Sequence, residues 1–117
     1  MPEKRQNKRA LTALFIRFTV DDNNSISYKT FSRDMCVDGI CLLSPKRLKL
    51  NDNLQLNIDI PNNPDMTLAE GNVRWTSQKS MINEDGKEVF PAGVAFTYLE
   101  SRDKAFLSEF IGKKEKV

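Results

Sequence analysis

Polar and apolar residues alternate along most of this chain with the period of β-strands. The clearest case is the segment of residues 54–60, where Leu54, Leu56, Ile58 and Ile60 are separated by single polar residues. Such strict alternation predicts a strand with one face in a core and the other in solvent. Runs rich in β-branched and aromatic residues predict five further strands, over residues 11–20, 25–33, 40–43, 67–77 and 92–98.

The apolar period changes from two residues to that of a helix after residue 100. We predict a helix over residues 101–111, with Ser101 as its cap, Asp103 in its first turn and Gly112 at its end. Four residues make up its expected apolar face: Ala105, Phe106, Phe110 and Ile111.

The segments between these elements are short and rich in turn residues. A turn is expected at residues 21–24, an irregular connection at 34–39, and a polar loop at 80–91 with an Asp85-Gly86 turn. The alternation slips between Tyr28 and Phe31, which suggests a bulge. Gly71 inside a strand suggests a bulge or a close backbone approach. Closely spaced strands with short turns imply an antiparallel barrel or sandwich, and the helix would cover one opening or edge of it.

Composition narrows the function classes. The chain has 117 residues, the size of one domain, and its net charge of +2 is too small for a general binder of nucleic acid. It has no histidine, no P-loop and no dinucleotide fingerprint, so we expect no catalytic residues and no metal ligands. Neither a signal peptide nor a membrane-spanning run is present, and two cysteines, Cys36 and Cys41, suggest reduced thiols in the cytoplasm.

Two short motifs stand out, although each has a plain structural explanation. The first is Arg5-Gln-Asn-Lys-Arg9, within a polar, basic segment that we interpret as a mobile arm over residues 1–10. The second is Asp34-Met-Cys-Val-Asp-Gly39, which alone would be a turn with Gly39 at positive φ. Arginine also suits one binding task, because its planar fork matches guanine O6 and N7 as well as phosphate oxygens.

In this order the two motifs resemble the PilZ family, whose signature is R-x-x-x-R followed by [DN]-x-S-x-x-G. The segments Gly71–Trp75 and Gly93–Phe96 resemble the family's G-x-V-x-W and G-V-x-F strands, so the resemblance covers about residues 4–111. It implies an all-β fold, a six-stranded antiparallel β-barrel with a C-terminal α-helix. It also implies a bacterial receptor whose ligand is the second messenger cyclic di-GMP, with no cofactor.

The resemblance assigns roles to matching positions. Arg5 and Arg9 would bind guanine edges and phosphates, and Asp34 would accept hydrogen bonds from guanine N1–H and N2–H₂. Gly39 would allow the backbone to approach the ligand. The neighbouring residues Lys4 and Lys8 would add attraction for the phosphates.

One position departs from the family pattern, because Cys36 stands where the family has serine. A thiol is a weaker hydrogen-bonding group than a hydroxyl, and the loss of one net hydrogen bond costs about 1 kcal/mol. Binding would weaken about fivefold. Trp75 has two interpretations, packing in the core or rim and stacking on a guanine. Cys41 lies in an apolar run and is expected in the core.

The resulting domain scheme has the arm at residues 1–10, one barrel domain over 11–112 and a solvated tail at 113–117. A receptor of this kind would signal through an unidentified effector protein, as a monomer or homodimer, without binding DNA or inserting into a membrane. The alternative is a degenerate barrel that binds a protein partner without nucleotide. A third possibility, a binder of single-stranded nucleic acid, is disfavoured by the low charge and the 9% aromatic content.

Overall fold

The computed structural model describes residues 10–11, 14–21, 23–36, 38–61 and 63–115. Its elements follow one another along the chain as eight strands and one helix. They are β1 (Ala10–Leu11), β2 (Phe15–Val20), β3 (Asn23–Cys36), β4 (Gly39–Ser44), β5 (Asn53–Ile58), β6 (Thr67–Thr76), β7 (Met81–Ile82), β8 (Glu88–Leu99) and α1 (Ser101–Glu115).

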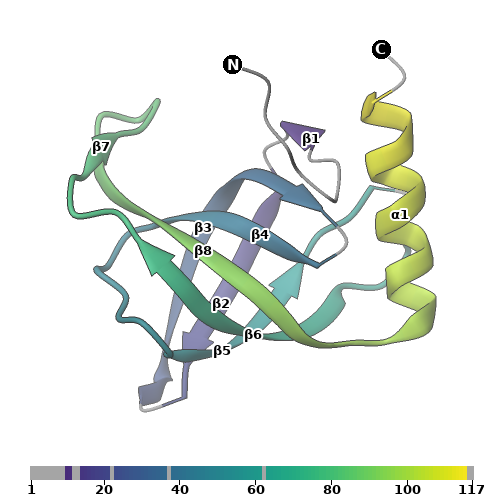
Figure 1. Ribbon diagram of the computed structural model, residues 1–117, viewed down its shortest axis with the longest axis horizontal. Helices are drawn as coiled ribbons and strands as arrows, with labels where there is room; N and C mark the ends of the chain where they lie inside the picture. Colours follow the sequence, from purple (N-terminus) through teal and green to yellow (C-terminus); the bar gives the residue numbers. More distant parts are fainter. Residues whose placement is uncertain (1–9, 12–13, 22, 37, 62, 116–117) are drawn as a thin grey trace.

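Six of the strands close on themselves to form a barrel. Neighbouring strands pair in the order β3-β2-β5-β6-β8-β4, and β4 pairs again with β3, so the ring is complete. Each of these pairings is antiparallel. Two short strands lie outside the ring, β1 against β3 and β7 against β8 (Figure 1). The predicted six-stranded antiparallel barrel with a C-terminal helix is therefore confirmed.

The core fills the barrel interior, and strand alternation explains its composition. In β5, Leu54, Leu56 and Ile58 are almost completely buried, whereas Asn53 and Gln55 are exposed. The same alternation in β2 buries three apolar side chains and exposes the arginine between them. Burial of these large side chains supplies the main stabilisation of the fold.

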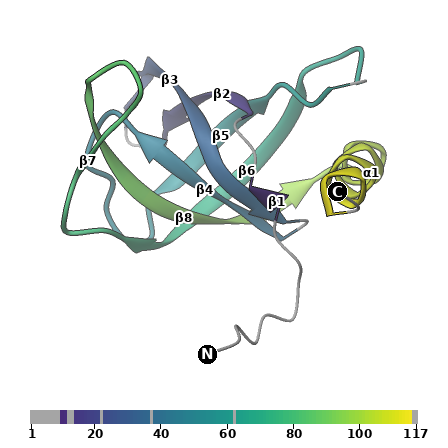
Figure 2. The same ribbon diagram turned by 90° about the horizontal axis from the view of Figure 1, so that it is seen from above.

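Helix α1 lies at one end of the barrel, on the opposite side of the molecule from strand β7 (Figures 1 and 2). Leu107 and Ile111, one turn apart, are its buried core residues, and Phe106 and Phe110 are partly buried beside them. The predicted face was wrong at Ala105, which is exposed. The helix also continues through Gly112 to Glu115 instead of ending there, because a glycine inside a helix costs only about 1 kcal/mol.

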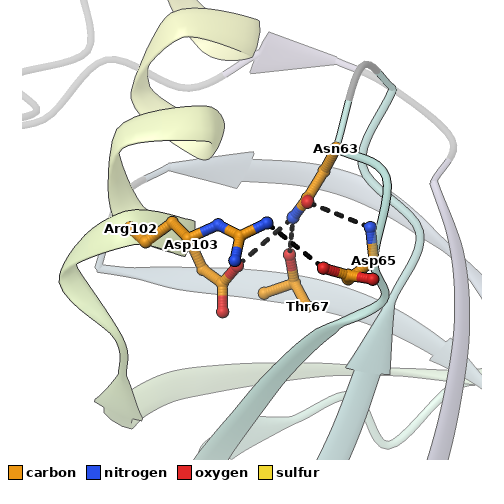
Figure 3. Close-up of polar contacts among 5 residues, drawn as sticks. All are labelled: Asn63, Asp65, Thr67, Arg102 and Asp103. Carbon is orange, nitrogen blue, oxygen red and sulfur yellow. Dashed lines mark hydrogen bonds and ion pairs between the residues drawn. The ribbon is translucent and has the colours of Figure 1, made fainter.

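A polar cluster fastens the first turn of α1 to the loop between β5 and β6 (Figure 3). The Asn63 side-chain amide donates to Thr67 Oγ1 at 2.9 Å and to Asp103 Oδ1 at 3.2 Å. The Asn63 side-chain oxygen, Oδ1, accepts from the Asp65 backbone N–H. Arg102 adds an exposed ion pair with Asp65 at 3.2 Å. One asparagine thus connects the loop, β6 and the helix.

Two segments predicted as irregular are parts of strands. Residues 34–36 belong to β3, because β4 pairs with all three of them and β1 pairs with Asp34 and Met35. The bulge on β3 against β4 lies between Ser32 and Asp34, not between Tyr28 and Phe31 as predicted. At Gly71, where a bulge or a close approach was expected, the structure shows a close approach, because a Cβ there would overlap Val94 Cγ1. The register shift beside it leaves Thr97 of β8 as the extra residue.

The predicted loop at 80–91 contains β7 and the first residues of β8. Residues 88–91 have mixed composition and pair with β7 and β4, and such pairing overrides the turn-rich composition of the surrounding segment. The Asp85-Gly86 turn is confirmed, with Gly86 at a φ of 77°. No helix within the described ranges has the length and apolar composition needed to cross a membrane.

Candidate ligand-binding site

The Asp34–Gly39 motif forms the hairpin connection between β3 and β4. Cys36 pairs with Gly39, Met35 with Ile40, and Asp34 with Cys41. The motif is therefore not a separate loop but the end of a two-stranded ribbon. Such a ribbon holds its side chains in a fixed register.

Gly39 serves close packing rather than an unusual backbone angle. Among the described residues the only glycine at positive φ is Gly86, so the expected positive φ of Gly39 is wrong. A Cβ added to Gly39 would lie 2.5 Å from the Val94 carbonyl oxygen. Only glycine lets β4 approach β8 at this point without displacing the backbone.

Four residues from four adjacent strands form one cross-strand row on the barrel. Asp34 of β3 pairs with Cys41 of β4, Cys41 pairs with Gly93 of β8, and Gly93 pairs with Trp75 of β6. We call this set the Asp34–Trp75 row. At a strand spacing of about 4.8 Å, the row is about 14 Å long, measured along the curved barrel wall. The topology thus places two residues that were singled out separately in the sequence on one cross-strand row.

The row lies on the outer face of the barrel. Met35, Ile40 and Leu42 all belong to the core cluster. Since side chains alternate along a strand, Asp34 and Cys41 point the other way. Cys41 is buried, as predicted, yet it is not part of the core cluster. It is the buried β4 member of the Asp34–Trp75 row.

Trp75 lies above Gly93 at the far end of the row. A Cβ on Gly93 would overlap the indole ring, so the ring covers the glycine directly. The side chain remains 42% exposed. Packing in the barrel core is therefore wrong for Trp75, and packing at the rim is what the structure shows. Its exposed surface is accessible to a flat ligand, on which an indole can stack.

The N-terminal segment joins the barrel beside Asp34. In β1, Leu11 pairs with Asp34 and Ala10 with Met35. The chain is fixed again at Leu14, whose N–H donates to Ser32 Oγ at 3.0 Å. The segment that carries Lys4, Arg5, Lys8 and Arg9 thus leads into a strand attached at the site, although these four residues lie outside the described ranges, as does the Cys36 side chain.

Sequence analysis missed Arg33, which the structure places at the site. The Arg33 Nε lies 3.7 Å from Asp34 Oδ2. Adjacent strand residues normally face opposite sides, so the sequence gives no reason to group them. The slip in alternation on this strand was the available signal, but it was assigned to the wrong residues.

A polar pocket of about 230 Å³ lies beside the hairpin connection, toward α1. Its walls are Asp38, Phe96, Thr97, Tyr98, Leu99 and Lys104. The Phe96 N–H donates to the Asp38 carbonyl at 2.8 Å, which connects the hairpin to β8. The Glu100 carboxylate, above all, raises the pKa of Tyr98, because a nearby negative charge disfavours the phenolate.

The described residues contain no group of three or more side chains arranged to hold a metal ion. The arrangement instead offers a carboxylate and a guanidinium at one end of the Asp34–Trp75 row and an exposed indole at the other end. These groups suit a planar ligand with hydrogen-bond donors and negative charge.

Comparison with protein-family models matches residues 3–113 to the PilZ domain. The chain belongs to the PilZ family. No curated protein matches it. The PilZ match spans nearly the whole sequence, so both motifs and all the described elements up to residue 113 fall within it.

Solved PilZ structures share this fold at low sequence identity. The PilZ domain of YcgR from Escherichia coli, solved with c-di-GMP, has a TM-score of 0.69 at 14% identity and covers 97% of this chain and 93% of that one. The Bacillus subtilis inhibitor of motility has a TM-score of 0.73 at 15% identity. That match covers 98% of this chain and 53% of the other, so this chain spans about half the length of the Bacillus protein.

Proposed function

We propose that this PilZ domain binds cyclic di-GMP over the Asp34–Trp75 row. The observation that carries the proposal is that Asp34 and Trp75 are the two ends of one cross-strand row on the outer wall of the barrel, and that the N-terminal segment joins the barrel at Asp34. The bound c-di-GMP in the YcgR structure, which has the same fold, supports this choice of ligand.

The chemistry of the residues matches that ligand part by part. The Asp34 carboxylate accepts from the Watson–Crick edge of a guanine, and the Trp75 indole stacks on a base. Arg5 and Arg9 clamp guanine acceptors and phosphates from the arm, assisted by the charges of Lys4 and Lys8. Cys36 stands at the motif position where the family has serine, and Gly39 keeps the hairpin close to β8.

Contact of Arg5 and Arg9 with the ligand would hold the N-terminal segment against the barrel, and this change is the signal. It would reshape the adjacent surface, which a partner protein in the cytoplasm then recognises. The domain acts in this scheme as a receptor without catalytic activity.

The test is isothermal titration calorimetry of the domain with cyclic di-GMP, with Arg9→Ala beside it. Arg102→Ala is the matched control, because it removes an arginine from an exposed ion pair on α1. We expect saturable binding at micromolar concentration or tighter, lost in Arg9→Ala and kept in Arg102→Ala. The absence of both heat and thermal stabilisation would overturn the proposal in favour of a protein-interaction module.

Cys36→Ser restores the family residue and gives a second readout. We expect it to tighten binding about fivefold, the value of one net hydrogen bond. Unchanged or weaker binding would show that position 36 does not contact the ligand in the expected way.

A further inference from the structure

Arg33 and Asp34 are consecutive residues of one strand, yet their side chains meet. The Arg33 Nε lies 3.7 Å from Asp34 Oδ2. In a regular strand successive side chains point to opposite faces, so this contact cannot form without a local irregularity. Its presence therefore requires a cause in the backbone.

The cause is a bulge in β3. Ser32 pairs with Leu42, but Asp34 pairs with Cys41, so Arg33 is the extra residue without a counterpart on β4. Bulges re-aim side chains and are enriched beside functional sites. Here the bulge turns Arg33 to the same outer face as Asp34.

Neighbouring contacts hold the bulge in place. Ser32 is only 2% exposed, its Oγ accepts from Leu14 N–H, and its own N–H donates to the Leu14 carbonyl at 3.0 Å. On the other side of Arg33, Asp34 pairs with both β1 and β4. The position of Arg33 is thus set by packed elements and does not depend on a free loop.

The ion pair between Arg33 and Asp34 contributes little to the stability of the fold. The Arg33 side chain is 44% exposed, and pairs of such exposure contribute about 0–1 kcal/mol. The Asp34 side chain, at 12% exposed, is the better-buried partner. A half-exposed guanidinium therefore projects from the surface directly beside the carboxylate that would bind guanine.

We propose that Arg33 is a third ligand-binding arginine of this domain, one that orients Asp34 in the free protein and binds a phosphate of the ligand in the complex. The proposal rests on the proposed binding of cyclic di-GMP. A guanidinium has five donors in a fixed fork, so it can keep a contact to a carboxylate while binding a phosphate oxygen. Its position beside Asp34 would fix the distance between the guanine and the phosphate that the site accepts.

The experiment is calorimetric titration of wild type, Arg33→Ala, Arg33→Lys and Arg102→Ala with cyclic di-GMP at several salt concentrations. We expect Arg33→Ala to raise Kd about tenfold, as the loss of a charge-assisted hydrogen bond does. Its Kd should also depend less steeply on salt, because one phosphate contact is lost. Arg33→Lys keeps the charge but not the fork and should fall between the two. Arg102→Ala should match wild type.

The outcomes separate this inference from the proposed function. If wild type does not bind, the proposed function fails. If wild type binds and Arg33→Ala binds equally well or more tightly, the ligand-binding role of Arg33 is overturned, and Arg33 only competes for Asp34. Should Arg33→Ala not fold, Arg33→Lys decides: an unchanged Kd would overturn the proposal, and a raised Kd with a thermal unfolding curve like wild type would support it.

Discussion

The Trp75 indole covers the α-carbon of Gly93 so closely that no side chain fits between them. The indole ring therefore packs directly on the Gly93 backbone, at one end of the Asp34–Trp75 row. Gly93 also pairs with Cys41 across β4 and β8, so the surface under the ring is part of the barrel wall.

Gly93→Ala should displace the indole ring. Because Trp75 is the only tryptophan, its fluorescence reports the change directly. We expect a shifted emission maximum, a loss of stability of about 1–3 kcal/mol from overpacking, and weaker binding of cyclic di-GMP. Emission identical to wild type would contradict the described contact. Trp75→Phe serves as the companion variant, with weaker stacking but little loss of stability at this exposed position.

Gly39→Ala and Gly112→Ala form a matched pair with opposite expected signs. The first places a Cβ 2.5 Å from the Val94 carbonyl and should lower the free energy of unfolding by about 1–3 kcal/mol. The second meets open space inside α1 and should raise it by about 0.5–1 kcal/mol. Urea denaturation measures both. A destabilised Gly112→Ala would argue that the helix ends before this residue.

Asn63→Ala should loosen α1 from the barrel. It removes the hydrogen bonds to Thr67 and Asp103, which we expect to cost about 1–3 kcal/mol. The control is Arg102→Ala, which breaks only the exposed ion pair with Asp65 and should cost at most about 1 kcal/mol. Thermal unfolding of the two variants gives the comparison, and equal midpoints would show that Asn63 is not the main fastening.

Glu100→Gln should lower the pKa of Tyr98. The Glu100 carboxylate is the largest cause of the raised value, because a nearby negative charge disfavours the phenolate. Burial and the Tyr98–Glu100 hydrogen bond raise the pKa further, as do the charges of Glu70 and Asp103. An NMR titration of the Tyr98 ring in wild type and variant measures the difference, and an unmoved pKa would contradict the assigned cause.

Strands in which polar and apolar residues alternate were predictable from the sequence. Segments that become strands only through pairing with neighbouring strands were not. Residues 54–58 bury every second side chain, and this pattern is visible in the letters alone. Residues 34–36 and 88–91 have mixed composition and become strand only because the neighbouring strands β1, β4 and β7 pair with them. The phase of the helix was misjudged because Ala105 fits an apolar face by type, whereas the barrel end contacts Leu107.

The candidate site was predictable by motif but not by arrangement. Asp34 and Gly39 were identified through the family pattern. Their place in one row with Gly93 and Trp75 depends on strand order across the closed ring. Arg33 was missed for a similar reason, since the bulge that re-aims it exists only relative to β4.

Closure of the ring also limits how this domain can associate with other proteins. The pairing of β4 with β3 covers residues 32–36 of β3 and not residues 23–31, and the strands outside the ring, β1 and β7, have two residues each. Free edges are the usual templates for intermolecular sheet growth. Where the ladders are complete on both sides of a strand, contacts with a partner therefore rely on side chains and not on backbone pairing.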